Sequence, residues 1–201
     1  MKPCVLISGY YAPTSYFSCI KEASEVLIEL QENYQRQTIR NRCHILTANG
    51  IQILSIPIVH STDKKLINIR IDYSTPWVSK HIQAIRSAYG KTPFFLYFFD
   101  DLISPLSQKY EYLWQLNDAI MQTCLKKLKI EKKIKFTEYY IHSYENANDY
   151  RNLFSKKKFP YINNYQAKTY FQAFNDRYPF SAELSILDLI FNTGYEARNY
   201  L

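Results

Sequence analysis

Short apolar runs, some of them alternating with polar residues, dominate the first third of the chain and predict strands. Residues 4–8 are apolar almost throughout and end at Gly9, and a turn and short helix are predicted over residues 10–20. The predicted strands are residues 4–8, 25–30, 51–59 and 66–71. In the last of these, Ile67, Ile69 and Ile71 share one face, as period-two alternation requires.

The middle of the chain changes to a helical period. Thr75-Pro76 predicts a helix start, with Thr as the cap and Pro at the first helical position, and Gly90 predicts the end of that helix. The apolar residues at helical spacing in between are Val78, Ile82, Ile85 and Tyr89. Thr92-Pro93 repeats the start signal and precedes residues 94–99, which are apolar on every side and are therefore expected to be buried.

The longest predicted helix spans residues 108–128. Its inner stripe is Leu113, Leu116, Ile120, Cys124 and Leu128. The later elements are a strand through Ile134, Phe136 and Tyr140, a short helix at 170–174, and a last helix with a capping box at 185–188 and Gly194 at its end. This order predicts one α/β domain over residues 1–201, a mostly parallel sheet flanked by helices, with α+β as the alternative.

Composition narrows the class of protein. The 201 residues suit one domain, and 47% hydrophobic with 21% charged residues excludes wholesale disorder. The 19 Tyr and 12 Phe reflect either A/T-rich codon usage or an aromatic-lined site.

The four Cys have no metal-ligand spacing, and no phosphate-loop, dinucleotide or zinc-protease motif occurs, so we predict no cofactor and no metal. The apolar runs are too short for a signal-peptide core or a membrane span, so we expect a cytoplasmic protein without a transmembrane segment.

The densest polar cluster covers residues 34–45. If this segment is helical, Arg36, Arg40 and His44 share one face; if it is extended, Arg40, Arg42 and His44 do. Like charges this close call for a counter-anion, which is either a substrate phosphate or carboxylate or an internal Asp or Glu. Both alternatives stay open at this point.

Three other features are candidates for chemistry. His81 follows Trp77 by one turn and is either a general base beside an aromatic wall or a half-buried helix-edge histidine. Tyr10, Tyr11 and Tyr16 crowd the first strand-to-helix turn, where they form a ligand platform or simply pack. The Lys-rich runs at 126–135 and 156–158 are typical of solvated surfaces, and without interleaved aromatic residues in the first run we expect no nucleic-acid partner.

Four blocks of the chain resemble the WbqC-like family. The residues that carry the resemblance are Tyr34-Gln35-x-Gln37-x-x-Arg40-Asn41-Arg42, Tyr11-x-Pro13-x-x-Tyr16-Phe17, Pro76-Trp77-x-x-x-His81, and Leu184-Ser185-Ile186-Leu187-Asp188 with Gly194. Many members open with His-Gln-Pro, where this chain has Ile7-Ser8-Gly9. The resemblance implies a cytosolic protein encoded among surface-polysaccharide genes and associated with O-antigens whose amino sugars carry an amino-acid group such as glycyl.

The function that the resemblance implies is an acyl- or aminoacyltransferase acting on the amine of a nucleotide-linked amino sugar, with an aminoacyl or acyl carrier as donor. In this hypothesis Arg40 and Arg42 hold an anionic group, Asn41 orients an amide or hydroxyl, and His81 takes the proton of the amine. Tyr11, Tyr16 and Trp77 would line the pocket. The alternatives are an ATP-using nucleotide-binding enzyme and a non-catalytic partner of a polysaccharide assembly enzyme.

Overall fold

The computed structural model describes residues 1–157, 159 and 166–201, and its larger sheet has four strands. The strands are β1 (Cys4–Ile7), β2 (Val26–Glu29), β5 (Ile134–Phe136) and β6 (Asn148–Asp149), in the order β5-β2-β1-β6. All three pairings are parallel, and Ile7 lies opposite Glu29 at the end of the β1–β2 ladder. The prediction of an α/β fold with a parallel sheet is confirmed.

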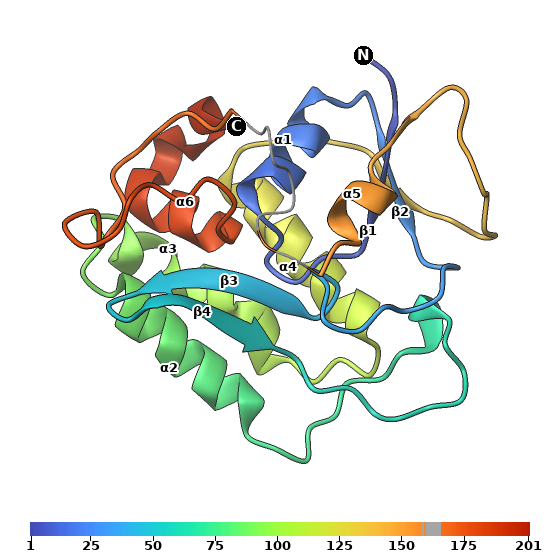
Figure 1. Cartoon of the computed structure of the whole chain (residues 1–201), viewed down its shortest axis with the longest axis horizontal. Helices are drawn as coiled ribbons and strands as arrows, with labels where there is room; N and C mark the ends of the chain where they lie inside the picture. The colour runs from blue at the N-terminus through green and yellow to red at the C-terminus, as the bar shows by residue number, and fades with distance from the viewer. Residues whose placement is uncertain (158, 160–165) are drawn as a thin grey trace.

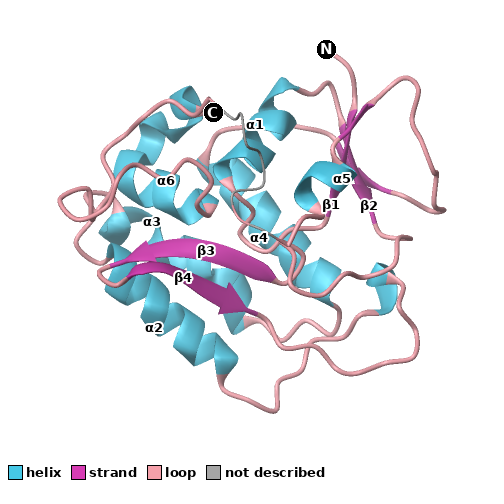
Figure 2. Ribbon diagram, viewed as in Figure 1, coloured by secondary structure: helices cyan, strands magenta, loops and turns pink. Residues whose placement is uncertain are grey.

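The helices are α1 (Thr14–Glu22), α2 (Trp77–Tyr89), α3 (Phe95–Ile103), α4 (Leu113–Lys127), α5 (Arg151–Phe154) and α6 (Ile186–Thr193). Three 3₁₀ segments complete the set: η1 (Leu66–Asn68), η2 (Ser104–Ser107) and η3 (Gly194–Tyr200). The sheet lies at one side of the molecule, near α1, α4 and α5, while α2, α3 and α6 lie on the other side (Figures 1 and 2). Every residue of β1 is buried, as expected for a parallel strand covered on both faces.

A second, antiparallel ribbon consists of β3 (Arg42–Thr47) and β4 (Gly50–Ser55) and runs across α2 (Figure 1). The segment around Arg40, which the sequence left open between helix and strand, thus becomes extended from Arg42 onward. The predicted strand over 51–59 is right only up to Ser55.

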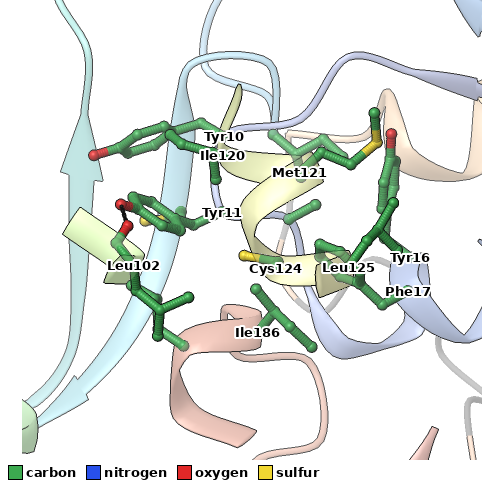
Figure 3. Packing of buried hydrophobic residues seen from close by; sticks show 14 of the residues in the cluster. Tyr10, Tyr11, Tyr16, Phe17, Leu102, Ile120, Met121, Cys124, Leu125 and Ile186 are labelled. Atoms are coloured by element: carbon green, nitrogen blue, oxygen red, sulfur yellow. Dashed lines mark hydrogen bonds between the residues drawn. The ribbon is translucent and has the colours of Figure 1, made fainter. Parts of the chain in front are cut away.

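One hydrophobic core draws on residues from Cys4 to Ala197. Figure 3 shows Met121, Cys124 and Leu125 of α4 in the core, with Tyr10 and Tyr11 on one side, Tyr16 and Phe17 on the other, and Ile186 of α6 below. The predicted inner stripe of α4 is confirmed, since all five of its residues are buried. That residues 1–201 are one domain stays a prediction.

Several local predictions are wrong for identifiable reasons. Residues 66–71 form a 3₁₀ turn and isolated bridges instead of a strand, because their amides bond to separate loops, Leu66 N to Glu32 O and Ile71 N to Glu111 O. Residues 170–174 are not helical. The side chains of Tyr170 and Gln172 instead reach Asp188.

Two helix-end predictions and one burial prediction also need correction. Helix α2 begins at Trp77 with Pro76 as its cap, and Thr75 makes no side-chain cap. In α6, Ser185 caps Leu187 N as predicted, but the Asp188 carboxylate bonds to distant side chains instead of completing a capping box. On α3, Leu96 and Tyr97 are 88% and 69% exposed, since only one face of that helix meets the core.

Candidate functional site

The segment that follows β1, residues 8–14, contacts the three other sequence blocks that carry the family resemblance. Tyr10 N donates to Ile39 O at 2.8 Å, beside the Arg-Asn-Arg block. Ile186 N donates to Ala12 O at 3.0 Å, which fixes the start of α6 against the same segment. We call residues 8–14 the hub segment, because blocks that lie far apart in sequence meet there.

The third contact of the hub segment is with His81. The Tyr10 hydroxyl lies 2.8 Å from His81 Nδ1, within hydrogen-bond distance. Burial lowers the pKa of His81 to about 4, which keeps the ring neutral. Tyr10 engages Nδ1 of His81, so this nitrogen is not offered to a substrate in this conformation.

The other aromatic candidates are also buried; the hydroxyls of Tyr11 and Tyr16 bond to the backbone, whereas the Trp77 indole N–H has no partner among the described residues. The Tyr11 hydroxyl donates to Leu102 O at 2.6 Å (Figure 3), and the Tyr16 hydroxyl donates to Ile7 O at 2.9 Å. Tyr11 has a φ of 38°, a left-handed conformation that is uncommon outside glycine. Trp77 packs edge-on against His81 with ring centroids 5.1 Å apart. These side chains fix the shape of the hub segment.

Arg40 is fully buried and has an internal carboxylate as its partner. Its Nε and Nη2 donate to Glu32 Oε1 and Oε2 at 2.8 and 2.7 Å, a bidentate ion pair. Ser155 Oγ accepts a further bond from Nη2 at 3.0 Å. Of the two counter-anions that the sequence left open, the structure places the internal one against Arg40. Arg36, by contrast, is exposed.

The other two residues of the Arg-Asn-Arg block, Asn41 and Arg42, differ from Arg40 in their surroundings. Asn41 is buried, and its Nδ2 donates to Ile56 O at 3.0 Å, while its Oδ1 has no partner among the described residues. Arg42 is half-buried, and its Nε donates to Ser55 Oγ at 3.3 Å. No carboxylate of the described residues lies within ion-pair distance of Arg42.

A second buried ion pair, which the sequence did not single out, lies at the carboxyl end of β2. Glu29 is fully buried and accepts from Gln31 N at 2.7 Å, Thr137 Oγ1 at 2.8 Å and Arg151 Nη1 at 3.2 Å. Arg151 also pairs with Asp149, and these bonds raise its pKa. This network joins the ends of β2 and β6 and is satisfied internally.

The carboxyl ends of β1 and β2 border a narrow recess that α4 closes from the other side. We call it the edge recess; its cavity volume is about 10 Å³, which is room for about one water molecule. It is lined by Ser8, Gly9, Tyr16, Ile28, Trp114, Asn117, Asp118, Met121 and Phe136. In parallel α/β sheets, ligands bind outside the carboxyl ends of the strands, so this is the place where the fold favours a site.

Two polar atoms of the edge recess have no partner among the described residues. Asn117 Nδ2 donates to Ser8 Oγ at 2.9 Å and to Arg40 O at 2.8 Å. Because Arg40 O can only accept, this bond fixes the amide orientation and leaves Asn117 Oδ1 unpaired. The Trp114 indole N–H is likewise buried and unpaired. Unpaired buried polar atoms are rare and costly, which makes them candidates for ligand contacts.

Asp118 adds a titratable group to the edge recess. Burial raises the pKa of this carboxyl, and the hydrogen bond from Gln122 opposes that effect. Asn117 carried a signal that could have been found in the sequence, since it is a polar residue next to the inner stripe of α4. Asp118 and Trp114 carried none.

The thiols do not form a nucleophilic or metal site in the described part of the chain. All four Cys are unpaired, and burial raises the pKa of Cys4 and of Cys19 to about 12. Burial also raises the pKa of Cys43 and Cys124. Since the thiolate is the reactive form, none of these environments activates a thiol. Among the described residues, no group of three or more His, Cys, Asp or Glu is placed to bind a metal ion.

Fold and site together define an α/β protein with a parallel sheet and buried, unpaired polar groups at the sheet's carboxyl edge. The model of the WbqC-like protein family matches residues 8–174, and the chain belongs to this family. The match begins at Ser8, so it includes the whole hub segment.

A relative is found in Mycobacterium tuberculosis (strain ATCC 25618 / H37Rv). The chain is 24% identical to its "Uncharacterized protein Rv1507c" over 227 aligned residues, which cover 100% of this chain and 98% of that protein. No solved structure matches the chain. Within the part of the chain that the structure describes, no helix has the length and apolar character to cross a membrane.

Proposed function

We propose that the protein is a transferase that adds an acyl or aminoacyl group, of glycyl type, to the amine of a nucleotide-linked amino sugar. The reaction would serve the synthesis of a surface polysaccharide of the O-antigen type in the cytoplasm. The family resemblance supports the reaction class and the substrate. The edge recess supports the position of the site.

The observation that carries the proposal is the pair of unpaired polar atoms in the edge recess. Asn117 Oδ1 can accept a hydrogen bond from a sugar hydroxyl or a base amide, and the Trp114 N–H can donate one to a hydroxyl or phosphate oxygen. Phe136, which is 37% exposed and packs edge-on against Trp114, offers an aromatic face to a base or a sugar ring.

We assign different roles to the residues that the family resemblance indicates. Arg42 is the cation of the Arg-Asn-Arg block that has no ion-pair partner among the described residues, so we assign it an anionic group of a substrate or donor. Arg40 holds the block in place through Glu32. His81, Trp77, Tyr11 and Tyr16 keep the hub segment in its conformation.

A second candidate, an ATP-using nucleotide-binding enzyme, is favoured by one observation. The sheet order β5-β2-β1-β6 is, in the order in which the strands occur, third-second-first-fourth. This is the beginning of the doubly wound order 3-2-1-4, a fold that commonly binds nucleotides at the carboxyl edge of its sheet. A nucleotide is also part of the substrate in the first proposal, so only ligand preference separates the two.

A thermal-shift screen tests the proposal. The ligands are nucleotide sugars with a free amine, the same sugars with a hydroxyl or N-acetyl group instead, ATP, and a short RNA. A ligand at about 100 times its Kd stabilises the native state by about 2.7 kcal/mol, which for this chain length raises Tm by roughly 5–10 °C. We expect a shift with the amine-bearing nucleotide sugars, and a smaller one in Trp114→Phe, which keeps the ring contacts but removes the N–H donor.

The other outcomes of this screen each favour a different function. A shift with ATP alone favours the nucleotide-binding enzyme. A shift with RNA that collapses as salt rises favours nucleic-acid binding through the lysine-rich surface. The absence of any shift contradicts the proposal and leaves the partner-protein alternative, for which exposed Leu96, Tyr97 and Tyr195 offer a surface.

A further inference from the structure

One outer face of the molecule combines exposed apolar side chains with lysines. Leu96 and Tyr97 of α3 and Tyr195 of η3 are all exposed, Leu96 to 88%. The buried face of α3 packs against α6, where the rings of Phe95 and Phe191 lie 5.4 Å apart, so Leu96 and Tyr97 point away from the core (Figure 1). Exposed apolar side chains that gather on one face indicate an interaction surface.

Contacts between rings and cations make this face continuous. The Tyr195 ring packs edge-on against Phe98 of α3, with ring centroids 5.1 Å apart. Lys127 Nζ lies 5.6 Å from the centre of the Phe98 ring and also pairs with Asp101. Lys129 Nζ lies 5.4 Å from the centre of the Tyr195 ring. The exposed apolar side chains therefore have ammonium groups directly beside them.

Lys129 also borders an open groove at the end of α4, with a volume of about 470 Å³. Lys126 and Lys132 line the same groove, and Glu131 is the acid among its lining residues. Lys132 Nζ donates to Ala23 O. Among the described residues, no carboxylate lies within ion-pair distance of these three lysines. The groove thus offers ammonium groups to an anion from outside the chain.

Further cations gather around η3, on the same side. Lys21 Nζ donates to Arg198 O at 2.9 Å, Lys168 Nζ to Asn199 O at 2.6 Å, and Arg198 Nη1 to Lys129 O at 3.0 Å. Desolvation and the nearby charges of Lys168 and Arg198 lower the pKa of Lys21, as expected where cations lie close together. The acids around this face are Glu22, Asp100, Asp101, Glu131 and Glu196, and they are fewer than its cations.

We propose that this face, formed by α3, η3 and the end of α4, binds the surface of a membrane that contains anionic phospholipids. Leu96, Tyr97 and Tyr195 enter the interfacial layer, where leucine and aromatic side chains are favoured. Lys126 and Lys129 contact lipid phosphates in the groove. The net charge of +7 adds long-range attraction to an anionic surface. This inference goes beyond the proposed function and does not depend on it.

Two observations favour a membrane over a protein or a nucleic acid. Lysine is depleted in protein–protein interfaces, whereas Lys127 and Lys129 lie directly against the rings of this face. A groove for single-stranded nucleic acid uses aromatic rings on which bases stack, but the most exposed side chain here, Leu96, has no ring. Leucine and tyrosine beside lysines are the combination that binds a lipid interface.

Sedimentation with lipid vesicles tests the proposal. The probes are vesicles of phosphatidylcholine alone, and vesicles in which about one third of the lipid is phosphatidylglycerol, which carries one negative charge. We expect the protein to sediment with the anionic vesicles and to stay in solution with the neutral ones. About 0.5 M NaCl should release most of it, because the Debye length then falls to about 4 Å.

Two variants separate the charges from the apolar contact. Lys126→Gln/Lys129→Gln should weaken vesicle binding about 25-fold, since each cation near an anionic surface contributes about fivefold. Its control is Lys64→Gln/Lys80→Gln, which makes the same charge change at exposed positions on the loop after β4 and on α2. This control should bind within about twofold of the wild type.

The second variant is Leu96→Ser/Tyr97→Ser. It should weaken vesicle binding at least about tenfold, because it removes the apolar area that the membrane would bury. Tyr139→Ser, at a similarly exposed tyrosine on the loop after β5, is its control and should bind as the wild type does. All four variants change exposed side chains and should unfold at nearly the wild-type Tm.

The proposal is overturned if the anionic vesicles do not bind the protein, if neutral vesicles bind it equally well, or if either test variant binds as the wild type does. A dimer in sedimentation velocity without vesicles, which Leu96→Ser/Tyr97→Ser dissociates, would assign the face to a second copy of the chain instead. Binding of a short RNA in the absence of vesicle binding would assign the lysines to a nucleic acid. No nucleotide sugar is present in these assays, so their failure leaves the proposed function untouched.

Discussion

The guanidinium of Arg40 and the carboxylate of Glu32 form a bidentate ion pair, with Nε–Oε1 at 2.8 Å and Nη2–Oε2 at 2.7 Å. Arg40 is wholly buried and the Glu32 side chain is 11% exposed, so the pair is largely removed from water. Burial by itself raises the pKa of Glu32 and the bonds from Arg40 lower it, which shows how strongly the two depend on each other. The pair anchors the loop between β2 and β3 next to the hub segment.

Replacing Arg40 should therefore lower the stability of the protein, and not only its affinity for a ligand. We expect Arg40→Gln to lower the free energy of unfolding by about 3–5 kcal/mol, since it leaves a buried carboxylate without its partner. Urea unfolding at pH 7 measures this. Arg36→Gln is the control, with an expected change within about 0.5 kcal/mol because Arg36 is exposed. If Arg40→Gln is as stable as the wild type but no longer binds the ligand, Arg40 binds the substrate instead of stabilising the fold.

The neutral state of His81 predicts a loss of stability in acid. Its pKa is about 4 in the folded protein against 6.5 when exposed. Between pH 4 and pH 6.5, His81 binds a proton more tightly in the unfolded chain than in the folded protein. The contribution of neutral His81 to the free energy of unfolding is therefore complete above pH 6.5 and is lost as the pH falls toward 4. Between pH 7.5 and 4.5 it amounts to roughly 2–3 kcal/mol.

His81→Gln removes this titration, and comparing it with the wild type cancels the other groups. We expect the wild type to lose roughly 2–3 kcal/mol more than His81→Gln over that range, as measured by urea unfolding at both pH values. Equal pH dependence of the two proteins would mean that His81 is accessible to protons, and thus available for the acid–base role that the sequence suggested.

Burial raises the pKa of Glu183, which predicts the opposite pH dependence of stability. Its pKa is about 7 in the folded protein against 4.5 when exposed, so the folded state favours the protonated carboxyl. The stabilisation is fully present below pH 4.5 and is lost as the pH rises through 7, by about 3 kcal/mol in total at pH 8 or above. Glu183→Gln should thus gain about 3 kcal/mol relative to the wild type between pH 5 and pH 8. A constant difference over this range would show that Glu183 is ionised in an ordinary way.

Local pattern predicted the elements whose burial follows a regular period. The strand β1 was found as a continuous apolar run, β2 and β5 because apolar residues alternate there with charged ones, and the stripe of α4 because its apolar residues recur at helical spacing. Residues 66–71 show the same alternation, but their backbone partners are three different loops, which no local pattern encodes. Tyr140 was assigned to a strand for its apolar character, whereas its ring stacks on the Arg151 guanidinium at 5.2 Å.

The site was predictable only in part for a similar reason. The Arg-Asn-Arg block stood out by its charge, but its partner Glu32 is one of many surface-like acids in the sequence. Glu29 and Arg151 lie 122 residues apart and meet only because β6 returns to the edge of β1. Glu183 precedes a recognisable helix start, yet its lack of a cation follows from packing that the sequence does not display.

The most direct test of the central claim is hydrogen–deuterium exchange, followed by mass spectrometry, with and without a saturating amine-bearing nucleotide sugar. If the ligand covers the mouth of the edge recess, protection should appear in peptides covering residues 8–16 and 113–121, which supply most of its wall. Trp114→Phe should need about five- to tenfold more ligand for the same protection, as the loss of one hydrogen bond predicts. Protection confined to peptides outside these two ranges, or none at all under saturating ligand, would contradict a substrate site at the carboxyl edge of the sheet.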